Sequence, residues 1–368
     1  MAQASSESLA SAKPAGPVDR QLRLAFIGCG GVTKFYLPPL KSFPDVEIVA
    51  GCDINPDRLA DVKNDWKVDA TFADWKEMLR EVKPEAVAVC TPNGLHMQPA
   101  IDAAEAGCHV LVEKPMAMTP AECQRMIDAA RRNNVKLQVG FQYRFHAHTE
   151  FLTRAAGAGE FGNVMFMKCR ALRRRGIPNW GVFGQKHLQG GGPMIDIGVH
   201  VIEMAHYFMG SPKPVAASGN TWTYLGDKPS DVASQWPGWD YKTYTVEDLA
   251  IGQVRFESGA LLQIESSFAA HIKEDVWNFT FMGDKGGGNW DPPEVYTDRA
   301  GTMINSTPGW ITNTDFLALF PLKLRNFVNA CLHDEPIRAP GEAGLAVQKI
   351  LDAIYRSAAA GGKEVAID

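Results

Sequence analysis

The chain has 368 residues, of which 45% are hydrophobic and 21% are charged, and its formal net charge at pH 7 is −5. This length allows two domains of ordinary size, each with a packed core. The mildly acidic balance argues against nucleic acid as a partner, and no apolar run reaches the ~18 residues that a membrane span needs.

The first 20 residues are rich in Ala, Ser and Pro and lack the apolar centre of a secretory signal. We therefore expect residues 1–20 to form a disordered tail. The seven cysteines are scattered and contain no Cys-x-x-Cys pair, which is typical of buried thiols in a reducing compartment. Both observations predict a cytoplasmic protein.

A dinucleotide site is predicted where the first apolar run ends. Residues 22–27 have the pattern of a buried strand, and Gly28 and Gly30 follow it directly, before a helical stretch. A second apolar run, residues 46–51, leads to Asp53, where a carboxylate would accept both ribose hydroxyls of NAD. Gly-x-Gly alone also occurs in ordinary turns between strand and helix, so the prediction depends on the order of all these elements. The candidate cofactor residues here are Gly28, Gly30, Gly31, Val32, Asp53, Ile54 and Arg58.

Strand and helix patterns continue to alternate up to residue 145. Strands are expected at 86–90, 109–112 and 136–141, and helices at about 96–106 and 120–133. This alternation with short links predicts an α/β domain, a doubly wound parallel sheet over residues 21–145.

The pattern changes in residues 146–368. We expect strands at 164–172, 249–256, 260–268 and 276–282, with a hairpin turn at 257–259, and helices at 195–209, 316–332 and 343–359. This predicts an α+β domain with a large, open, mostly antiparallel sheet. The apolar content of its strands exceeds what one sheet face needs, which favours a homodimer or homotetramer formed through this domain.

Three side chains could handle a proton on an alcohol. Lys114 follows the strand 109–112, and ligand sites in such sheets lie at the carboxyl ends of strands. Asp196 and His200 are four residues apart on one helix, so they share a face. We expect His200 to act as the base, Lys114 to hydrogen-bond the reacting oxygen and Asp196 to orient His200.

Other interpretations of these residues remain open. Lys114 could be a solvent-exposed lysine and His200 a packed core histidine. Asp196, His200 and Glu203 could instead bind a metal ion, as could His146 and His148. We expect no metal, because a nicotinamide dehydrogenase with a lysine beside the alcohol does not need one.

Four motifs together resemble the Gfo/Idh/MocA oxidoreductases over about residues 22–360. They are, in the order of the family, Gly28-Cys29-Gly30-Gly31, Thr91-Pro92-Asn93 with His96, Glu113-Lys114-Pro115, and Gly190-Gly191-Gly192 with Asp196 and His200. The resemblance implies a Rossmann domain, an α/β domain whose open sheet forms the oligomer interface, NAD or NADP as cofactor, and sugars or cyclitols as substrates.

The resemblance also implies roles for further residues. Those expected on the nicotinamide side of the cofactor are Thr91, Pro92, Asn93, His96, Glu113, Lys114 and Gln142. Those expected to bind the carbohydrate are Lys114, Tyr143, Arg144, Trp180, Asp196 and His200. The segments 142–145, 173–176, 236–240 and 282–287 are similar to members that oxidise glycosides at C3.

The sequence thus predicts an NAD-dependent dehydrogenase that oxidises a secondary hydroxyl of a sugar, glycoside or cyclitol, with C3 of a pyranoside favoured. NADP is less favoured, because the Asp53 carboxylate would repel a 2′-phosphate. Two alternatives remain open: an NAD-dependent glycoside hydrolase that works by transient oxidation, and a non-catalytic protein that binds NAD and a sugar.

Overall fold

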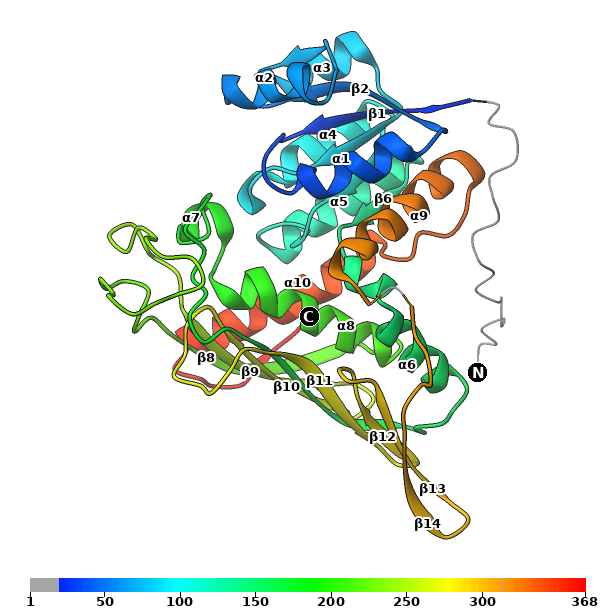
Figure 1. The fold of residues 1–368 in the computed structure, drawn as a ribbon, viewed down its shortest axis with the longest axis vertical. Coiled ribbons are helices and arrows are strands. Elements are labelled where there is room, and N and C mark those ends of the chain that lie inside the picture. Colours follow the sequence, from blue (N-terminus) through cyan, green and yellow to red (C-terminus); the bar gives the residue numbers. More distant parts are fainter. Residues whose placement is uncertain (1–19, 313) are drawn as a thin grey trace.

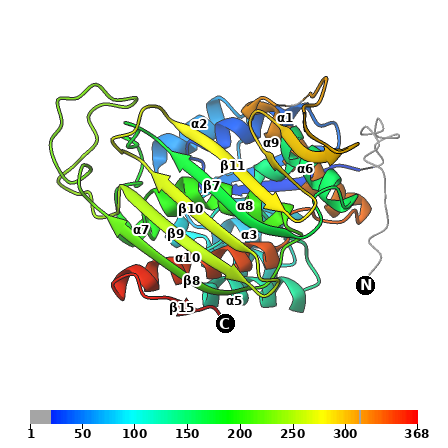
Figure 2. The same ribbon diagram turned by 90° about the horizontal axis from the view of Figure 1, so that it is seen from below.

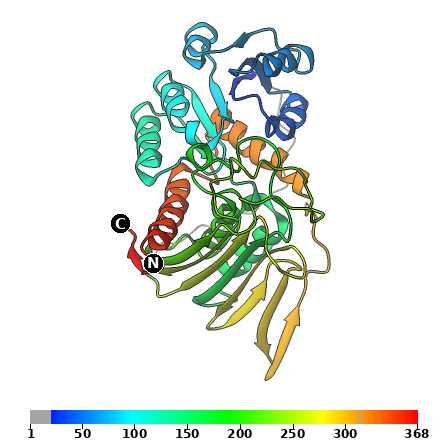
Figure 3. The ribbon, with the colours of Figure 1, turned by 90° about the vertical axis from the view of Figure 1, so that its left-hand side faces the viewer.

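The computed structural model describes residues 20–312 and 314–368 (Figure 1). The predicted disordered tail therefore lies outside the described residues, apart from Arg20. Within the described part, the strands form two sheets, and the helices lie between and around them (Figures 1 and 3).

The first sheet is parallel throughout, with the strand order β3-β2-β1-β4-β5-β6. This is the Rossmann order, in which the strand sequence reverses direction beside β1. Its strands are β1 (Leu22–Ile27), β2 (Val46–Cys52), β3 (Thr71–Phe72), β4 (Ala86–Val89), β5 (His109–Val112) and β6 (Leu137–Val139). Its helices are α1 (Thr33–Ser42), α2 (Pro56–Asn64), α3 (Trp75–Val82), α4 (Met97–Glu105) and α5 (Pro120–Arg132), with a short 3₁₀ turn at Asn93–Leu95.

Helix α5 shows why these elements form where they do. Thr119 caps it by accepting the Glu122 N–H, the Glu122 side chain accepts the Thr119 N–H in return, and Pro120 occupies the first turn. Such a capping box satisfies N–H groups that the helix itself cannot pair. This start signal is local, and the structure confirms the predicted helix to within one residue at its C-terminal end.

The second sheet is mixed but mostly antiparallel, in the order β14-β13-β12-β11-β7-β10-β9-β8-β15, with only β7 and β10 parallel. Its strands are β7 (Val164–Leu172), β8 (Pro214–Trp222), β9 (Leu249–Phe256), β10 (Leu261–Ser267), β11 (Val276–Gly283), β12 (Gly286–Asn289), β13 (Glu294–Arg299), β14 (Thr302–Ser306) and β15 (Val365–Ala366). The fold class predicted from the sequence is therefore confirmed, as is the β9–β10 hairpin. Strands β8 and β12 to β15 were not predicted.

Helices cover one face of this sheet and leave the other open. They are α6 (Ala147–Gly157), α8 (Val199–Phe208) and α10 (Gly341–Ala359). The short helix α7 (Lys186–Gln189) contacts the 3₁₀ turn after β4 instead. Figure 2 shows the strands in front and the helices behind them. The open face mixes apolar residues such as Ile251 and Met282 with the Lys168–Glu265 ion pair, so it is less apolar than the sequence led us to expect.

Two predicted helices begin differently from expectation. Residues Met194–Gly198 form a π-helical turn before α8, and Phe316–Ala318 form a 3₁₀ turn before α9 (Leu319–His333). Helix α9 packs against α1 (Figure 1), and its residues Phe320 and Leu324 join the core that contains β1. A segment from the second half of the chain thus completes one face of the first sheet.

Candidate functional site

The glycine turn after β1 leaves room for a phosphate. Gly28 has φ +87°, and a Cβ there would lie 2.6 Å from the main-chain carbon of Cys90, so only glycine fits. A Cβ at Gly30 or Gly31 would meet no protein atom within 4 Å, so the turn faces open space. Helix α1 begins next to Val32 without a side-chain cap. These features fit a dinucleotide pyrophosphate at the helix N-terminus.

Asp53 lies beside this turn. Its carboxylate accepts the N–H of Cys29 at 2.8 Å and the N–H of Asn55 at 2.9 Å. Ile54 is exposed, and Arg58 lies 3.4 Å from Asp61. The structure therefore brings Asp53 to the glycine turn, whereas Arg58 has a carboxylate partner of its own.

The loop after β4 is held by a buried histidine. The His96 ring places Nδ1 2.8 Å from the Pro115 carbonyl oxygen and Nε2 2.8 Å from the Thr91 carbonyl oxygen. Burial lowers the pKa of His96. His96 thus lies buried between the loops after β4 and β5, with a main-chain carbonyl oxygen beside each ring nitrogen, and the neutral ring can donate its single N–H to one of them. Asn93 donates to the Gln189 carbonyl oxygen at 3.1 Å, next to the glycine triplet.

Lys114 and Asp196 meet across the two halves of the chain. The Lys114–Pro115 peptide bond is cis. Lys114 Nζ donates to the Asp196 main-chain oxygen at 2.7 Å and to Asp196 Oδ1 at 2.9 Å, and the two side chains are 17% and 14% exposed. The lysine is therefore a fixed donor in a half-closed environment, and the interpretation of Lys114 as a free surface lysine is wrong.

His200 lies in the same cavity but without Asp196 as its partner. Its ring packs edge-on against Tyr143 at 5.2 Å between centroids and lies 5.9 Å from the Trp277 ring. Burial, together with the positive charges of Lys114, Lys323 and Arg173, holds the pKa of His200 well below its usual range. The imidazole is thus neutral. The expectation that Asp196 orients His200 is not met, because the Asp196 carboxylate bonds Lys114 instead.

Glu113 belongs to a buried cluster that the sequence did not reveal. Lys323 from α9 is fully buried, and its Nζ lies 3.0 Å from Glu113 Oε1 and 2.7 Å from Tyr36 Oη. Tyr36 also donates to Glu113. Lys323 occupies a position of α9 that faces the apolar core. A lysine at such a position in the sequence was the signal that could have revealed a buried partner of opposite charge. The cluster fixes the residue directly before Lys114.

The glycine triplet is held by two further residues that the sequence did not reveal. Glu247 accepts the N–H of Gly192 at 2.9 Å and of Met194 at 3.3 Å, and Tyr355 donates to Glu247 Oε1 at 2.7 Å. A Cβ at Gly192 would lie 2.1 Å from the Glu247 main-chain oxygen, which explains the glycine there. This anchored turn sets where the segment carrying Asp196 and His200 begins.

One cavity of about 520 Å³ collects most of these groups. It extends from Val32 and Glu113 beside the parallel sheet to the second domain. The predicted residues on its wall are Val32, Glu113, Lys114, Gln142, Tyr143, Trp180, Asp196 and His200, and those not predicted include Phe35, Arg173, Gln235, Asp275 and Phe316. Trp236 and Trp277 also line it, and Trp180 packs edge-on against Trp236 at 4.8 Å.

Arg144 does not reach this cavity, which corrects its prediction as a substrate ligand. Its guanidinium is buried, pairs with Glu203 and lies over the Tyr207 ring. Glu203 is thereby the ion-pair partner of Arg144. Within residues 20–312 and 314–368, no group of three His, Cys, Asp or Glu side chains is placed to hold a metal ion. No helix in that part of the chain is long and apolar enough to cross a membrane.

Comparison with known proteins gives relatives over most of the chain. The chain is 36% identical over 342 residues to D-glucoside 3-dehydrogenase of Escherichia coli (strain K12), covering 92% of this chain and 96% of the relative. It is 28% identical to levoglucosan dehydrogenase of Pseudarthrobacter phenanthrenivorans, over 67% of this chain and 65% of the relative. The solved structure of levoglucosan dehydrogenase in complex with NADH superimposes with a TM-score of 0.81 at 23% identity, covering 95% of this chain and 100% of that one.

Two family models divide the chain between them. Residues 22–141 match the NAD-binding Rossmann fold of the oxidoreductase family, and residues 155–367 match its C-terminal α/β domain. The glycine turn, Asp53 and the strand order provide the site that such a fold uses for NAD. The chain is an oxidoreductase that belongs to the Gfo/Idh/MocA family.

Proposed function

We propose that this protein is an NAD-dependent dehydrogenase that oxidises a secondary hydroxyl of a glycoside to a ketone, with C3 of a pyranoside as the favoured position. The observation that carries the proposal is the meeting of Lys114 and His200 in one cavity that extends to Val32, the residue directly after the glycine turn. The named activities of the glucoside and levoglucosan relatives support the choice of substrate.

The cofactor would be held by the glycine turn, by the N-terminus of α1 and by Asp53. When bound, NAD accepts the hydride from the carbinol carbon. NAD is proposed over NADP because the Asp53 carboxylate lies at the glycine turn, and Arg58, the nearest following arginine, is already beside Asp61. A 2′-phosphate would face like charge there.

The proton chemistry follows from the charges in the cavity. Lys114 Nζ, fixed by Asp196, donates a hydrogen bond to the reacting hydroxyl oxygen and stabilises its developing negative charge. His200 takes the hydroxyl proton, because its lowered pKa leaves the imidazole neutral and able to accept. Burial and the positive charges of Lys114 and Arg173 disfavour a long-lived imidazolium, so His200 would release the proton to water once the ketone has formed.

The walls of the cavity suit a sugar ring. Trp180, Trp236 and Trp277 present aromatic faces and edges to the space around Lys114 and His200. The C–H face of a pyranose packs well on such rings, whereas an open-chain polyol has no comparable apolar face. Arg173 and Asp275 on the same wall can hydrogen-bond the remaining hydroxyls.

A substrate panel tests the proposal. Methyl glucosides, free sugars, inositols and acyclic polyols are each incubated with NAD, and the formation of NADH and of ketone product is followed. We expect pyranosides to be oxidised fastest, with free NADH accumulating and the keto group at C3. Activity confined to acyclic polyols or inositols would contradict the substrate class. Release of aglycone without accumulation of NADH would identify a hydrolase instead, and NAD binding without turnover on any substrate would identify a non-catalytic protein.

A further inference from the structure

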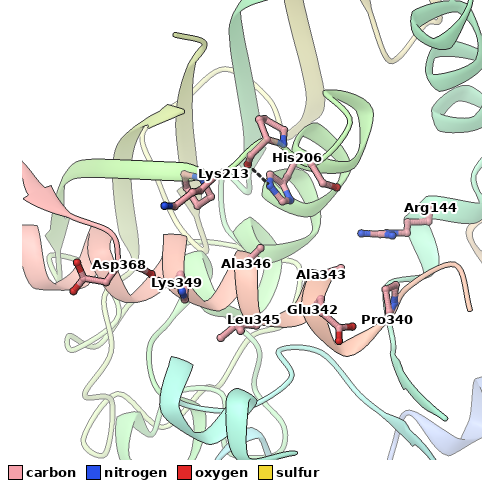
Figure 4. Close-up of a pocket in the computed structure, with 13 residues that line it drawn as sticks. Arg144, His206, Lys213, Pro340, Glu342, Ala343, Leu345, Ala346, Lys349 and Asp368 are labelled. Carbon is pink, nitrogen blue, oxygen red and sulfur yellow. Dashed lines mark hydrogen bonds between the residues drawn. The ribbon is translucent and has the colours of Figure 1, made fainter. Parts of the chain in front are cut away.

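Two ion pairs of the described residues have both side chains at least nine-tenths buried, Arg144–Glu203 and Lys323–Glu113. Arg144 lies beside the groove between the end of α8 and the first turns of α10 (Figure 4). It is therefore outside the catalytic cavity of about 520 Å³, which contains Lys114. Glu113 lines the catalytic cavity, so the Lys323–Glu113 pair is the one of the two that can act on the reaction.

Stability alone does not explain a lysine at position 323. Taking a carboxylate and an ammonium out of water costs about as much free energy as their attraction returns, and apolar side chains of similar volume often stabilise a core equally well. Lys323 is fully buried, and its Nζ lies 4.4 Å from the centre of the Tyr36 ring and 5.0 Å from that of the Phe320 ring. An apolar side chain would fit among these rings, so the charge of Lys323 calls for another reason.

The Glu113 carboxylate lies against the main chain of Lys114. Its Oε2 accepts the Lys114 N–H at 3.2 Å, and its Oε1 accepts from Lys323 Nζ at 3.0 Å and from the Tyr36 hydroxyl. A Cβ at Gly140 would lie 2.7 Å from Oε1, so the carboxylate is held close to the end of β6. Burial by itself would raise the pKa of Glu113, but the Lys323 charge, the Tyr36 hydrogen bond and the Lys114 charge together hold it below its usual value, so Glu113 is ionised.

Lys114 thus has two carboxylates on the wall of its own cavity, Asp196 and Glu113. Its Nζ lies 2.9 Å from Asp196 Oδ1, although Glu113 is the nearer residue along the chain. A lysine carries its ammonium on a flexible four-carbon stem, which can turn towards either carboxylate. Lys323 already compensates the charge of Glu113, and this leaves Asp196 as the carboxylate that attracts Lys114.

We propose that Lys323 is a positioning residue, which keeps Lys114 on Asp196 by neutralising Glu113. Without the Lys323 charge, Glu113 would be a buried carboxylate without a cation, and the ammonium of the next residue, Lys114, would pair with it. Lys114 Nζ would then point away from the reacting oxygen. The inference rests on the proposed function, in which Lys114 donates a hydrogen bond to that oxygen.

The test compares Lys323→Met with the double variant Lys323→Met/Glu113→Gln. Met fills the space of the lysine without its charge, and Gln removes the carboxylate that competes for Lys114. Initial rates of NADH formation on the preferred glycoside are measured with saturating NAD at about pH 8.5, where a histidine side chain is neutral. We expect the kcat of Lys323→Met to fall by about 10- to 100-fold with little change in KM, as for a charge-assisted hydrogen bond lost only in the transition state. The double variant should regain most of the lost kcat.

Arg325→Met is the matched control on the same helix. Arg325 Nη1 lies 2.6 Å from Asp45, whose side chain is 4% exposed. The variant therefore leaves a shielded carboxylate unpaired, as Lys323→Met does, but neither Arg325 nor Asp45 lines the catalytic cavity. It should lower the melting temperature while kcat stays at the wild-type value. A fall in kcat as large as that of Lys323→Met would show that the loss of any ion pair of α9 impairs the enzyme, and would overturn the proposal.

Crystal structures of the wild type and the variants give a second readout, which does not depend on turnover. We expect Lys114 Nζ to lie on Asp196 in the wild type and the double variant, and on Glu113 in Lys323→Met. Lys114 on Asp196 in Lys323→Met would overturn the proposal, as would a wild-type kcat of the folded single variant or a double variant that is equally slow. If the wild type oxidises no glycoside, the proposed function fails, and the position of Lys114 in the variants still decides the inference. Should Lys323→Met fail to fold, Lys323→Gln also removes the charge and gives the same decision.

Discussion

Removing the charge of Asp196 tests whether the Lys114–Asp196 pair serves the reaction. In Asp196→Asn, the carboxylate 2.9 Å from Lys114 Nζ becomes a neutral amide, while the 2.7 Å hydrogen bond to the main-chain oxygen remains. Coulomb attraction at this separation is about 6 kcal/mol at an effective dielectric constant of ~20, which is an upper bound. The interaction free energy lost in the variant should be closer to that of one charge-assisted hydrogen bond, about 1.5–3 kcal/mol.

If this loss weakens the hydrogen bond from Lys114 to the reacting oxygen in the transition state, the activation free energy rises by the same amount. kcat then falls by about 10- to 100-fold, since each ~1.4 kcal/mol corresponds to a factor of ten. NAD affinity should hardly change, because the glycine turn and Asp53 are untouched. The assay is the initial rate of NADH formation on the preferred glycoside, with NAD binding and melting temperature measured on the same preparation.

The Asp45–Arg325 pair offers a matched control. Its charges lie 2.6 Å apart and are similarly shielded from solvent, but neither residue lines the catalytic cavity. Asp45→Asn should lower the melting temperature by an amount comparable to Asp196→Asn while kcat stays at the wild-type value. A folded Asp196→Asn enzyme with wild-type kcat would refute the reasoning and reduce the Lys114–Asp196 contact to a structural ion pair.

Four further results are expected. His200→Ala should lower kcat by about 10²–10⁴-fold with little change in NAD binding, and a folded variant that keeps its kcat would exclude His200 as the base. Because the pKa of His200 in the free enzyme lies well below 6.5, the imidazole stays neutral as pH falls through that value, so the acid limb of the kcat/KM profile should appear well below pH 6.5; a limb at or above it would contradict the assignment. NAD should give a higher kcat/KM than NADP, and Asp53→Ser should narrow the difference; equal or better efficiency of the wild type with NADP would be evidence against the role of Asp53. Tyr355→Phe should lower the free energy of unfolding in urea by about 1–3 kcal/mol, because a buried hydrogen bond to Glu247 is lost, and an unchanged value would show that the glycine turn does not depend on it.

The oligomer expected from the sequence remains a prediction, and the open sheet face gives it a location. We expect light scattering to show a dimer or tetramer that Ile251→Glu dissociates, because a charge would then be buried at the contact. A wild-type monomer at every concentration would contradict this.

The sequence by itself determined the elements whose causes are local. The strands 22–27 and 164–172, the capping box of α5 and the β9–β10 hairpin depend on periodicity and turn residues within a few positions, and the structure has them as predicted. The order of motifs was also enough for the family. The sequence predicted Lys114 and His200 as cavity residues because strand ends and helix faces are local properties.

Only the tertiary structure decided how these groups are partnered. Lys114 meets Asp196 across 82 positions and Glu113 meets Lys323 across 210, and no local pattern specifies which carboxylate a buried lysine will find. Arg144 was placed wrongly for the same reason: the segment that brings Tyr143 to the catalytic cavity turns the next side chain away, towards Glu203 on α8. A buried charged group cannot be solvated by water, so it needs a partner within the protein. Which groups are buried, and which partners they meet, depends on how the whole chain packs.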